Sequence, residues 1–248
     1  MIRADAGERA AYLPVEAMRE AAMGEAAEMR AALDAYGWAD LGPVLGAEER
    51  AGLIGLWDEA ARFRSHVVMR RHGFGEGEYK YFADPLPGPV ARLREQLYPG
   101  LAAVANAWAA ALGEERRFPE SHVAFRETCR AAGQTRPTPL LLRYGEGDYN
   151  CLHQDVYGAV AFPLQVVVLL NDPAEFEGGE LVFTEQRPRM QSRAEVVSLR
   201  PGHAVAFAVN ERPRAGARGV YRVRQRHGVS RLRAGRRWTL GVIFHDAP

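Results

Sequence analysis

The chain has 248 residues, of which 47% are hydrophobic, so it is long enough to bury a substantial core within one compact domain. Its 32 basic and 31 acidic residues leave a formal net charge of +1, which excludes a strong overall field that would attract nucleic acid or a membrane. Cys129 and Cys151 are too few for a disulfide framework and fit no zinc-finger spacing, which favours a reducing compartment.

The amino terminus shows no charged and then apolar signal sequence, and no apolar run reaches the length needed to cross a bilayer. We therefore expect a soluble cytoplasmic protein without a membrane partner.

Residues 1–132 are predicted to be mainly helical. Residues 14–37 are rich in alanine and end at a glycine that can cap a helix, and residues 47–65 carry apolar side chains at helical spacing. Residues 89–113 continue this pattern, with an interruption expected at Pro99. The tryptophans and leucines of these segments are best interpreted as core residues.

Residues 70–89 are rich in glycine, proline and aromatic residues, which predicts a long loop. The loop is not a phosphate-binding P-loop, because Lys80 is not followed by Ser or Thr and two glutamates stand close by. Tyr79 and Tyr81 are candidates for substrate contact if this loop covers a site. An ordinary surface loop is the alternative.

From residue 138 the chain changes to short β-prone runs, each bounded by Gly, Pro, Asn or Asp. This spacing predicts an all-β sandwich or barrel, so the chain as a whole is α+β and mainly β, with the helical region packed against the β core. We expect one catalytic domain over residues 1–248. The predicted strands lie within residues 139–144, 162–171, 179–185, 194–209, 219–233 and 236–246.

The segment CLHQDVYG places His153 and Asp155 two residues apart. On a strand such residues share a face, so the imidazole and the carboxylate can converge on one metal ion. A hydrogen-bonded pair at a strand end is the alternative, because an isolated His-x-Asp often arises by chance.

A third ligand is expected from another strand, because two histidines and one carboxylate on one face of an octahedral ion are the ligands of non-heme Fe(II) oxygenases. His203 lies in a Pro-Gly turn and His245 near the end of the chain, whereas His227 begins a strand, a glycine turn and a second strand. We therefore choose His227. Arg237, ten residues later, can face the metal from the second strand and hold the far carboxylate of 2-oxoglutarate, whose keto-acid end would chelate iron.

The ordered segments YGEGDYNCLHQD, GGELVF, LRPGHAVAF and HGVSRLRAGRRWTLGVIF resemble the 2-oxoglutarate/Fe(II)-dependent dioxygenase superfamily, particularly its prolyl-hydroxylase-like branch. The resemblance covers about residues 138–248 and implies a double-stranded β-helix, the jelly-roll or cupin-like fold. It also implies Fe(II), 2-oxoglutarate and O2 as cofactor and co-substrates. The implied site residues are His153, Asp155 and His227 for the metal, Arg237 for 2-oxoglutarate, and Tyr144 and Tyr149 lining the cofactor pocket.

The segments HGFGEGEYKYFADPLP, GQTRPTPLLLRYGEGDYNCLHQD and TEQRPRMQSRAEVV are also similar to a bacterial subgroup of nucleic-acid oxygenases. This similarity implies oxidative demethylation of alkylated bases in damaged nucleic acid. Arg187, Arg189 and Arg193 in an expected hairpin loop are then candidates for contacts with phosphates. The nearly balanced charge, however, lacks the strong basic footprint of a tight DNA binder.

Two other interpretations stay open. The same pocket could serve the hydroxylation of a peptide side chain or of a small metabolite. A cupin-like barrel could also bind a ligand or DNA without turnover, with the metal in a structural role. Arg237 and the open metal positions favour catalysis, since protein ligands usually close a purely structural metal site.

Overall fold

The computed structural model describes residues 15–217 and 219–248, with side chains from residue 24 onward. The expected lack of a signal sequence rests on residues 1–37, of which residues 1–14 lie outside this described part. The helices are α1 (Val15–Tyr36), α2 (Ala47–Gly55), α3 (Gly88–Ala111) and α4 (His122–Ala131), with short 3-10 helices η1 (Leu56–Asp58), η2 (Ala60–Arg62), η3 (Met69–His72) and η4 (Pro173–Glu175). The strands are β1 (Trp38–Pro43), β2 (Phe63–Val68), β3 (Gly75–Glu76), β4 (Glu78–Phe82), β5 (Leu140–Tyr144), β6 (Tyr149–His153), β7 (Leu164–Leu169), β8 (Phe176–Gly178), β9 (Leu181–Gln186), β10 (Arg193–Val197), β11 (His203–Ala208), β12 (Glu211–Gly216), β13 (Gly219–Val229), β14 (Leu232–Gly235) and β15 (Arg237–Val242).

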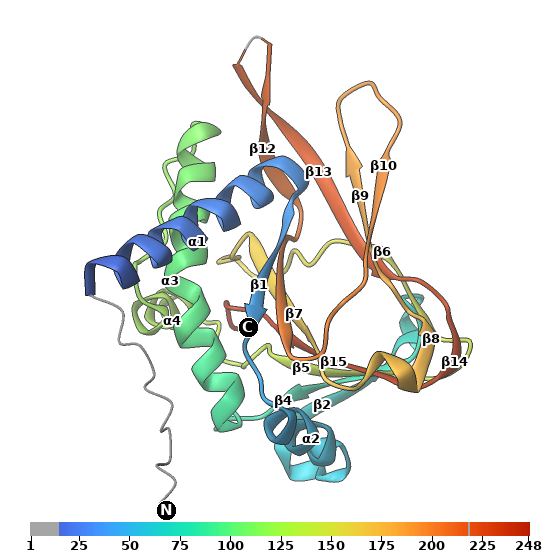
Figure 1. The fold of residues 1–248 in the computed structure, drawn as a ribbon. Coiled ribbons are helices and arrows are strands. Elements are labelled where there is room, and N and C mark those ends of the chain that lie inside the picture. Colours follow the sequence, from blue (N-terminus) through green and yellow to red (C-terminus); the bar gives the residue numbers. More distant parts are fainter. Residues whose placement is uncertain (1–14, 218) are drawn as a thin grey trace, which may run out of the picture.

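Two antiparallel sheets form the body of the molecule. The larger sheet has the strand order β1-β11-β7-β15-β5-β4-β2, and the smaller has the order β10-β9-β13-β6-β3, with β12 added beside β13. Helices α1, α3 and α4 lie on one side of the larger sheet, and the smaller sheet lies on the other (Figure 1). This arrangement confirms the predicted mainly β fold with a double-stranded β-helix core.

Strand β7 shows why the predicted strands read as continuous hydrophobic runs. All six of its residues are buried. Val166 and Val168 belong to the core cluster that includes α3, whereas Val167 and Leu169 belong to a second cluster with Phe183 of β9. Successive strand residues point to opposite faces, so a strand covered on both faces is hydrophobic throughout. The larger sheet therefore separates a core under the helices from a core between the two sheets.

Most of the described residues up to residue 132 are helical, as predicted, but four segments form strands β1 to β4. Strand β1 pairs with β11 at one edge of the larger sheet, and β4 pairs with β5 toward the other edge. The predicted loop at residues 70–89 thus contains a strand of the core sheet. Its flanking glycines and prolines concealed a short strand whose pairing partner lies about 60 residues away in sequence.

The helices follow the predictions except in two places. Helix α1 ends at Tyr36, and Gly37 has the left-handed φ of 79° expected of a capping glycine. Helix α2 ends at Gly55, earlier than predicted, and two 3-10 helices follow it. Helix α3 runs without a break through Pro99. A proline removes one backbone hydrogen bond, but the buried residues on both sides of Pro99, among them Tyr98 and Leu101, hold α3 against the core.

Hydrogen bonds between buried polar groups connect the segment after β15 to α3 and α4. Nη2 of Arg94 donates to Oδ1 of Asp246 at 2.8 Å, and both side chains are almost fully buried. A ring nitrogen of His122 lies 3.0 Å from the carbonyl oxygen of Phe244, and Nδ1 of His245 accepts from the backbone N–H of Phe162. The segment that follows β15 is therefore part of the core.

Acid is expected to destabilise this part of the fold. Burial, reinforced by the charge of Arg94, lowers the pKa of both His122 and His245 from 6.5 to about 4. The unfolded chain binds these protons more readily, so their contribution is fully present above pH 6.5 and is lost as the pH falls toward 4. The loss amounts to about 1.4 kcal/mol per pH unit for each histidine. Urea unfolding of the metal-free protein between pH 6.5 and 5 measures the slope, which should be smaller in His245→Asn. An equal slope in the variant and the wild type would contradict the assignment.

Candidate metal centre

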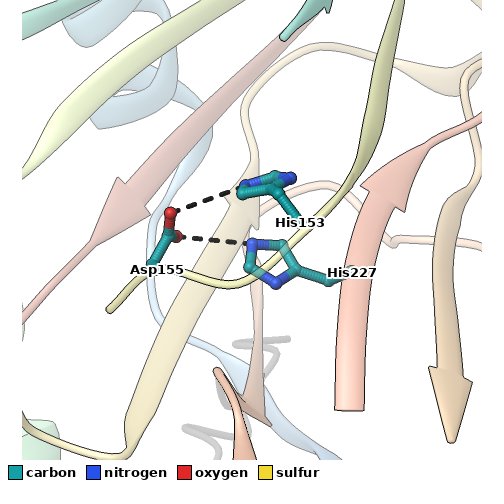
Figure 2. A group of neighbouring side chains, drawn as sticks. All are labelled: His153, Asp155 and His227. Atoms are coloured by element: carbon teal, nitrogen blue, oxygen red, sulfur yellow. Dashed lines mark ion pairs between the residues drawn. The ribbon is translucent and has the colours of Figure 1, made fainter. Parts of the chain in front are cut away.

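The three predicted metal ligands meet where β6 ends. His153 is the last residue of β6, and His227 lies near the end of β13. Asp155 lies in the loop after β6, so the expectation that it shares a strand with His153 is wrong. Strands β6 and β13 are antiparallel neighbours, and their register places His227 opposite His153. Nε2 of His153 is 3.5 Å from Oδ1 of Asp155, and Nε2 of His227 is 3.4 Å from Oδ2 (Figure 2). Ligand atoms of all three side chains lie within 4.8 Å of one another.

The pKa shifts of Asp155 and His153 favour the protonation states that bind a metal cation. Burial alone would raise the pKa of Asp155, but hydrogen bonding from His227 and the nearby imidazoles lower it below its ordinary value. Burial, together with His227, lowers the pKa of His153. An ionised carboxylate with neutral imidazoles is the form in which these side chains bind metals. Nδ1 of His153 lies 2.8 Å from the carbonyl oxygen of Cys151, a contact that leaves Nε2 free to face the metal position.

The ligand set leaves room for further ligands. Within the described residues, the group of potential metal ligands at this position consists of these three side chains. Two histidines and one carboxylate occupy one face of an octahedral ion, so a bound metal would keep positions open for a small molecule. A catalytic site requires such open positions, whereas a structural site normally closes them.

A cavity of about 400 Å³ opens beside the three ligands. Arg237 and Thr239 of β15 line it together with Gln165 and Val167 of β7, because alternate residues of these strands face the space between the sheets. The cavity is large enough for a small ligand. The three predicted metal ligands and Arg237 therefore line one cavity.

Arg237 is a buried cation that forms no ion pair within residues 15–217 and 219–248. Its side chain is only 2% exposed, and its Nη1 has no hydrogen-bond partner among the described residues. Burial lowers its pKa to about 10, although Tyr144 and Glu180 oppose the shift. Gly179 has a φ of 67°, and a Cβ there would lie 2.8 Å from Cδ of Arg237, so glycine at this position leaves space for the arginine. A buried unpaired charge is costly, and a carboxylate in the cavity would satisfy it.

The two predicted cofactor-pocket tyrosines have different positions. Tyr144 lines the cavity and is fully buried, with its ring 5.8 Å from Cζ of Arg237. Tyr149 is not among the residues that line the cavity, and its ring lies 5.9 Å from Cζ of Arg231. The expectation that Tyr149 lines the cofactor pocket is therefore wrong.

A bulge in β6 explains the position of Tyr149. Val229 pairs with Asn150, and His227 pairs with His153. Between these two pairs, β6 advances by three residues and β13 by only two, so β6 contains one extra residue. One extra residue reverses the faces of the residues before it. Asn150 lines the cavity instead, and its Nδ2 donates to the hydroxyl of Tyr144 at 3.4 Å. Strand alternation counted from His153 could not have identified Asn150.

Tyr79 and Tyr81 of β4 both line the cavity. Their rings meet edge to face at 5.4 Å, and burial raises the pKa of both hydroxyls. Gln165 and Tyr157, which the sequence interpretation missed, also line the cavity. Gln165 could have been found, because it is the polar residue in the otherwise apolar run of β7.

The remaining candidate residues lie elsewhere. His203 pairs with Asp40, and His245 is buried beside Tyr157, so neither joins the metal ligands. Arg187, Arg189 and Arg193 do not line the cavity and belong to the hairpin between β9 and β10.

Among the described helices, none is long and apolar enough to span a membrane.

Residues 77–247 match the model of a family described as oxygenases that catalyse oxidative methylation of damaged DNA. An uncharacterized protein of Mycobacterium tuberculosis, found in two strains, is 47% identical over 167 residues, which are 67% of this chain and 72% of that protein.

Two solved structures show the same fold. A prolyl hydroxylase from Trichoplax adhaerens, in complex with a hypoxia inducible factor peptide fragment, has a TM-score of 0.53 and 12% identity, with 94% of each chain covered. The non-heme α-ketoglutarate-dependent epimerase SnoN of nogalamycin biosynthesis has a TM-score of 0.51 and 17% identity, with 88% of this chain and 82% of that chain covered.

Proposed function

Because the chain belongs to the oxygenase family whose model it matches, we propose that it is a dioxygenase that uses Fe(II), 2-oxoglutarate and O2. The observation that carries this proposal is one cavity containing both a three-ligand metal group and a buried arginine with an unpartnered Nη1. A diacid that chelates a metal at one end and needs a cation at the other fits these two features.

The residues have distinct roles in this proposal. His153, Asp155 and His227 would hold the iron, and Arg237 would bind the far carboxylate of 2-oxoglutarate, with Tyr144 packed against it. The bound cofactor and co-substrates would supply the oxidation of a C–H bond, with release of succinate and carbon dioxide. Burial of Arg237 strengthens its attraction for a carboxylate and orients the co-substrate. We propose that residues 1–248 act as one catalytic domain, since β1, β2 and β4 extend the core sheet.

We propose that the substrate is nucleic acid carrying an alkylated base and that the reaction removes the alkyl group. The family description supports damaged DNA as the substrate class. Oxygen insertion into an N-methyl group gives a hydroxymethyl group, which decomposes to formaldehyde and the unmodified base. Tyr79 and Tyr81 would contact the extruded base, since both line the cavity. We place this activity in the cytoplasm.

Product analysis tests the function. Purified protein with Fe(II), ascorbate and 2-oxoglutarate is given an oligonucleotide with one N-methylated base, and a matched unmethylated oligonucleotide serves as the control. We expect formaldehyde and succinate in equal amounts with the methylated strand only. Succinate formed with stable oxygen addition to a peptide or a metabolite would favour a hydroxylase. If 2-oxoglutarate neither binds nor turns over, the non-catalytic cupin-like barrel is the better reading.

A further inference from the structure

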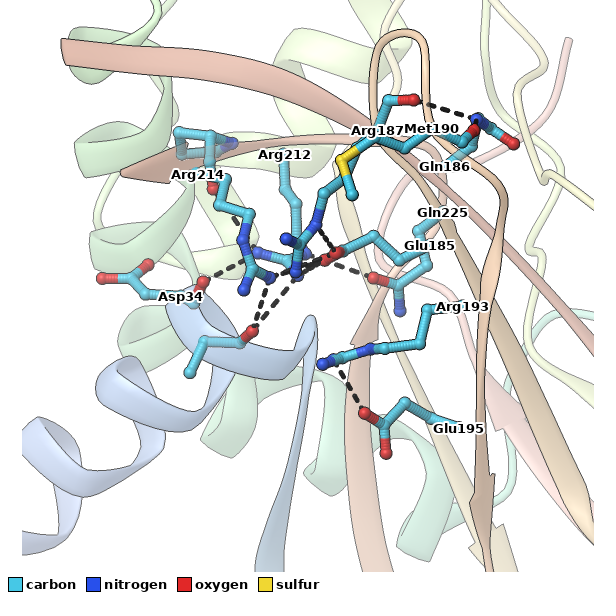
Figure 3. Close-up of polar contacts among 12 residues, drawn as sticks. Asp34, Glu185, Gln186, Arg187, Met190, Arg193, Glu195, Arg212, Arg214 and Gln225 are labelled. Carbon is cyan, nitrogen blue, oxygen red and sulfur yellow. Dashed lines mark hydrogen bonds and ion pairs between the residues drawn. The ribbon is translucent and has the colours of Figure 1, made fainter. Parts of the chain in front are cut away.

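Three arginines share one buried carboxylate at the far end of β9. Nε of Arg187 donates to Oε1 of Glu185 at 2.8 Å, and Nη1 of Arg214 donates to Oε2 at 2.9 Å. Nη2 of Arg212 contacts the same carboxylate. Figure 3 shows the three guanidinium groups converging on Glu185 near the C-terminal end of α1. We call Arg187, Arg212, Arg214 and Glu185 the arginine cluster.

The arginine cluster carries an excess of positive charge. Three guanidinium groups and one carboxylate give 3 − 1 = +2. The adjacent charges mostly cancel within their own pairs, since Arg193 lies 2.7 Å from Glu195. Burial and the neighbouring Arg214 lower the pKa of Arg212 to about 10, although Glu185 opposes the shift. Like charges held this close favour the binding of an anion between them.

The three arginines differ in how their donors are used. Arg212 is fully buried, and it donates to the carbonyl oxygens of Asp34 and Ala35 at the end of α1 as well as to Gln225. This arginine anchors the helix. In contrast, among the described residues Arg187 donates hydrogen bonds only through Nε, and Arg214 donates only through Nη1. Their side chains remain 26% and 23% exposed, so their other nitrogens are available to a ligand.

Part of the arginine cluster lies along β9, the strand that pairs with β13 and its candidate metal ligand His227. Phe183 of β9 pairs with His227, and Glu185 pairs with Gln225. Arg187 lies four residues beyond Phe183, or about 13 Å at roughly 3.3 Å per residue. Gln154, between two of the metal ligands in sequence, donates to the carbonyl oxygen of Gln225 at 3.1 Å. This spacing is short enough for one substrate chain to span.

The start of the β9–β10 hairpin is fixed. The side-chain amide of Gln186 donates to the carbonyl oxygens of Arg187 and Met190, and its oxygen accepts from the hydroxyl of Ser192. Glu185 also holds the guanidinium of Arg187 in one orientation. A rigid pair of donors loses little entropy when it binds a ligand.

We propose that Arg187 and Arg214 form a seat for a backbone phosphodiester of the nucleic-acid substrate, with Glu185 holding the two guanidinium groups in place. The proposal rests on the proposed function. Guanidinium groups bind phosphate oxygens through paired hydrogen bonds, and a phosphodiester would neutralise part of the excess charge. Of the arginines that the sequence suggested for phosphate contacts, the proposal keeps Arg187, whereas Arg193 forms an ion pair with Glu195. Arg214 is added, because its position outside the hairpin gave no sign of this role in the sequence.

The test measures how salt affects the affinity for a labelled single-stranded oligonucleotide, by fluorescence anisotropy of metal-free protein. The variants are Arg187→Gln and Arg214→Gln, and each should lose one phosphate contact. The slope of log Kd against log salt should fall by about 0.7 per lost contact, and Kd in low salt should rise roughly threefold or more. The matched control is Arg62→Gln, which removes an exposed, ion-paired arginine near α2, at the opposite end of the molecule (Figure 1).

The outcomes separate this proposal from the proposed function. Wild-type slopes in both variants, or no oligonucleotide binding by folded wild type, would overturn the phosphate seat. Neither result would affect turnover of 2-oxoglutarate, which is measured separately. A second arm uses inorganic phosphate as competitor. If inorganic phosphate displaces the oligonucleotide at a concentration equal to that of the oligonucleotide's own phosphates, the site binds free phosphate instead of a nucleic-acid backbone. This result also contradicts the proposal.

Discussion

Replacing Arg237 with methionine is expected to weaken 2-oxoglutarate binding by about 100-fold or more while stabilising the ligand-free protein. Removal of one partner from a buried, hydrogen-bonded charge pair costs about 2–5 kcal/mol of binding free energy. In the ligand-free protein the same arginine is buried, and its Nη1 has no partner among the described residues. An apolar side chain of similar length avoids that cost, so the free energy of unfolding should rise by about 1–4 kcal/mol.

Anaerobic titration measures the first effect through the visible charge-transfer band of the protein with Fe(II) and 2-oxoglutarate, and urea unfolding measures the second. Arg236→Met is the matched control, because Arg236 is the adjacent arginine in sequence and its side chain is exposed. It should change neither quantity appreciably. Tight 2-oxoglutarate binding in Arg237→Met, with Fe(II) still bound, would show that another cation holds the co-substrate.

Replacing His153 with alanine is expected to weaken Fe(II) binding by at least about 100-fold and to abolish oxygenase activity. Loss of a residue that merely supports a metal ligand typically costs 10–100-fold in affinity or activity, so loss of a ligand should cost more. The fold should persist, because His153 is a partly exposed residue at the end of β6. The loss therefore concerns the site alone.

Metal binding can be followed without turnover by the absorption of Co(II) as a probe for the same ligands. His203→Ala is the matched control, since His203 also pairs with an aspartate but lies apart from the metal ligands. It should bind the metal as the wild type does. A normal Co(II) spectrum in His153→Ala would contradict the assignment of the ligands.

Several features could be read directly from the sequence because they depend on local pattern or on order along the chain. The hydrophobic runs at residues 162–171 and 236–246 predicted buried strands, and β7 and β15 are buried throughout. The spacing of His153 and Asp155, with a later histidine before a glycine turn, predicted a metal group that the structure brings within 4.8 Å. Gly235, with a φ of 78°, ends β14 and lets the chain turn into β15 of the larger sheet, where Arg237 lines the cavity.

Other features depend on pairing between distant segments, which a local pattern does not encode. Strand β4 was hidden in a segment that resembles a loop, because its partner β5 comes about 60 residues later. The bulge in β6 exists only relative to β13, and it directs Asn150 instead of Tyr149 into the cavity.

By itself, therefore, the sequence predicted the class of fold and the three candidate metal ligands and Arg237 that the structure brings to one cavity, since these follow from hydrophobic pattern, residue type and order. Only the tertiary structure decided which tyrosines reach the cavity and which arginines share Glu185. The physical reason is that strand register sets the face of each side chain, and register is fixed by contacts between strands that are remote in sequence.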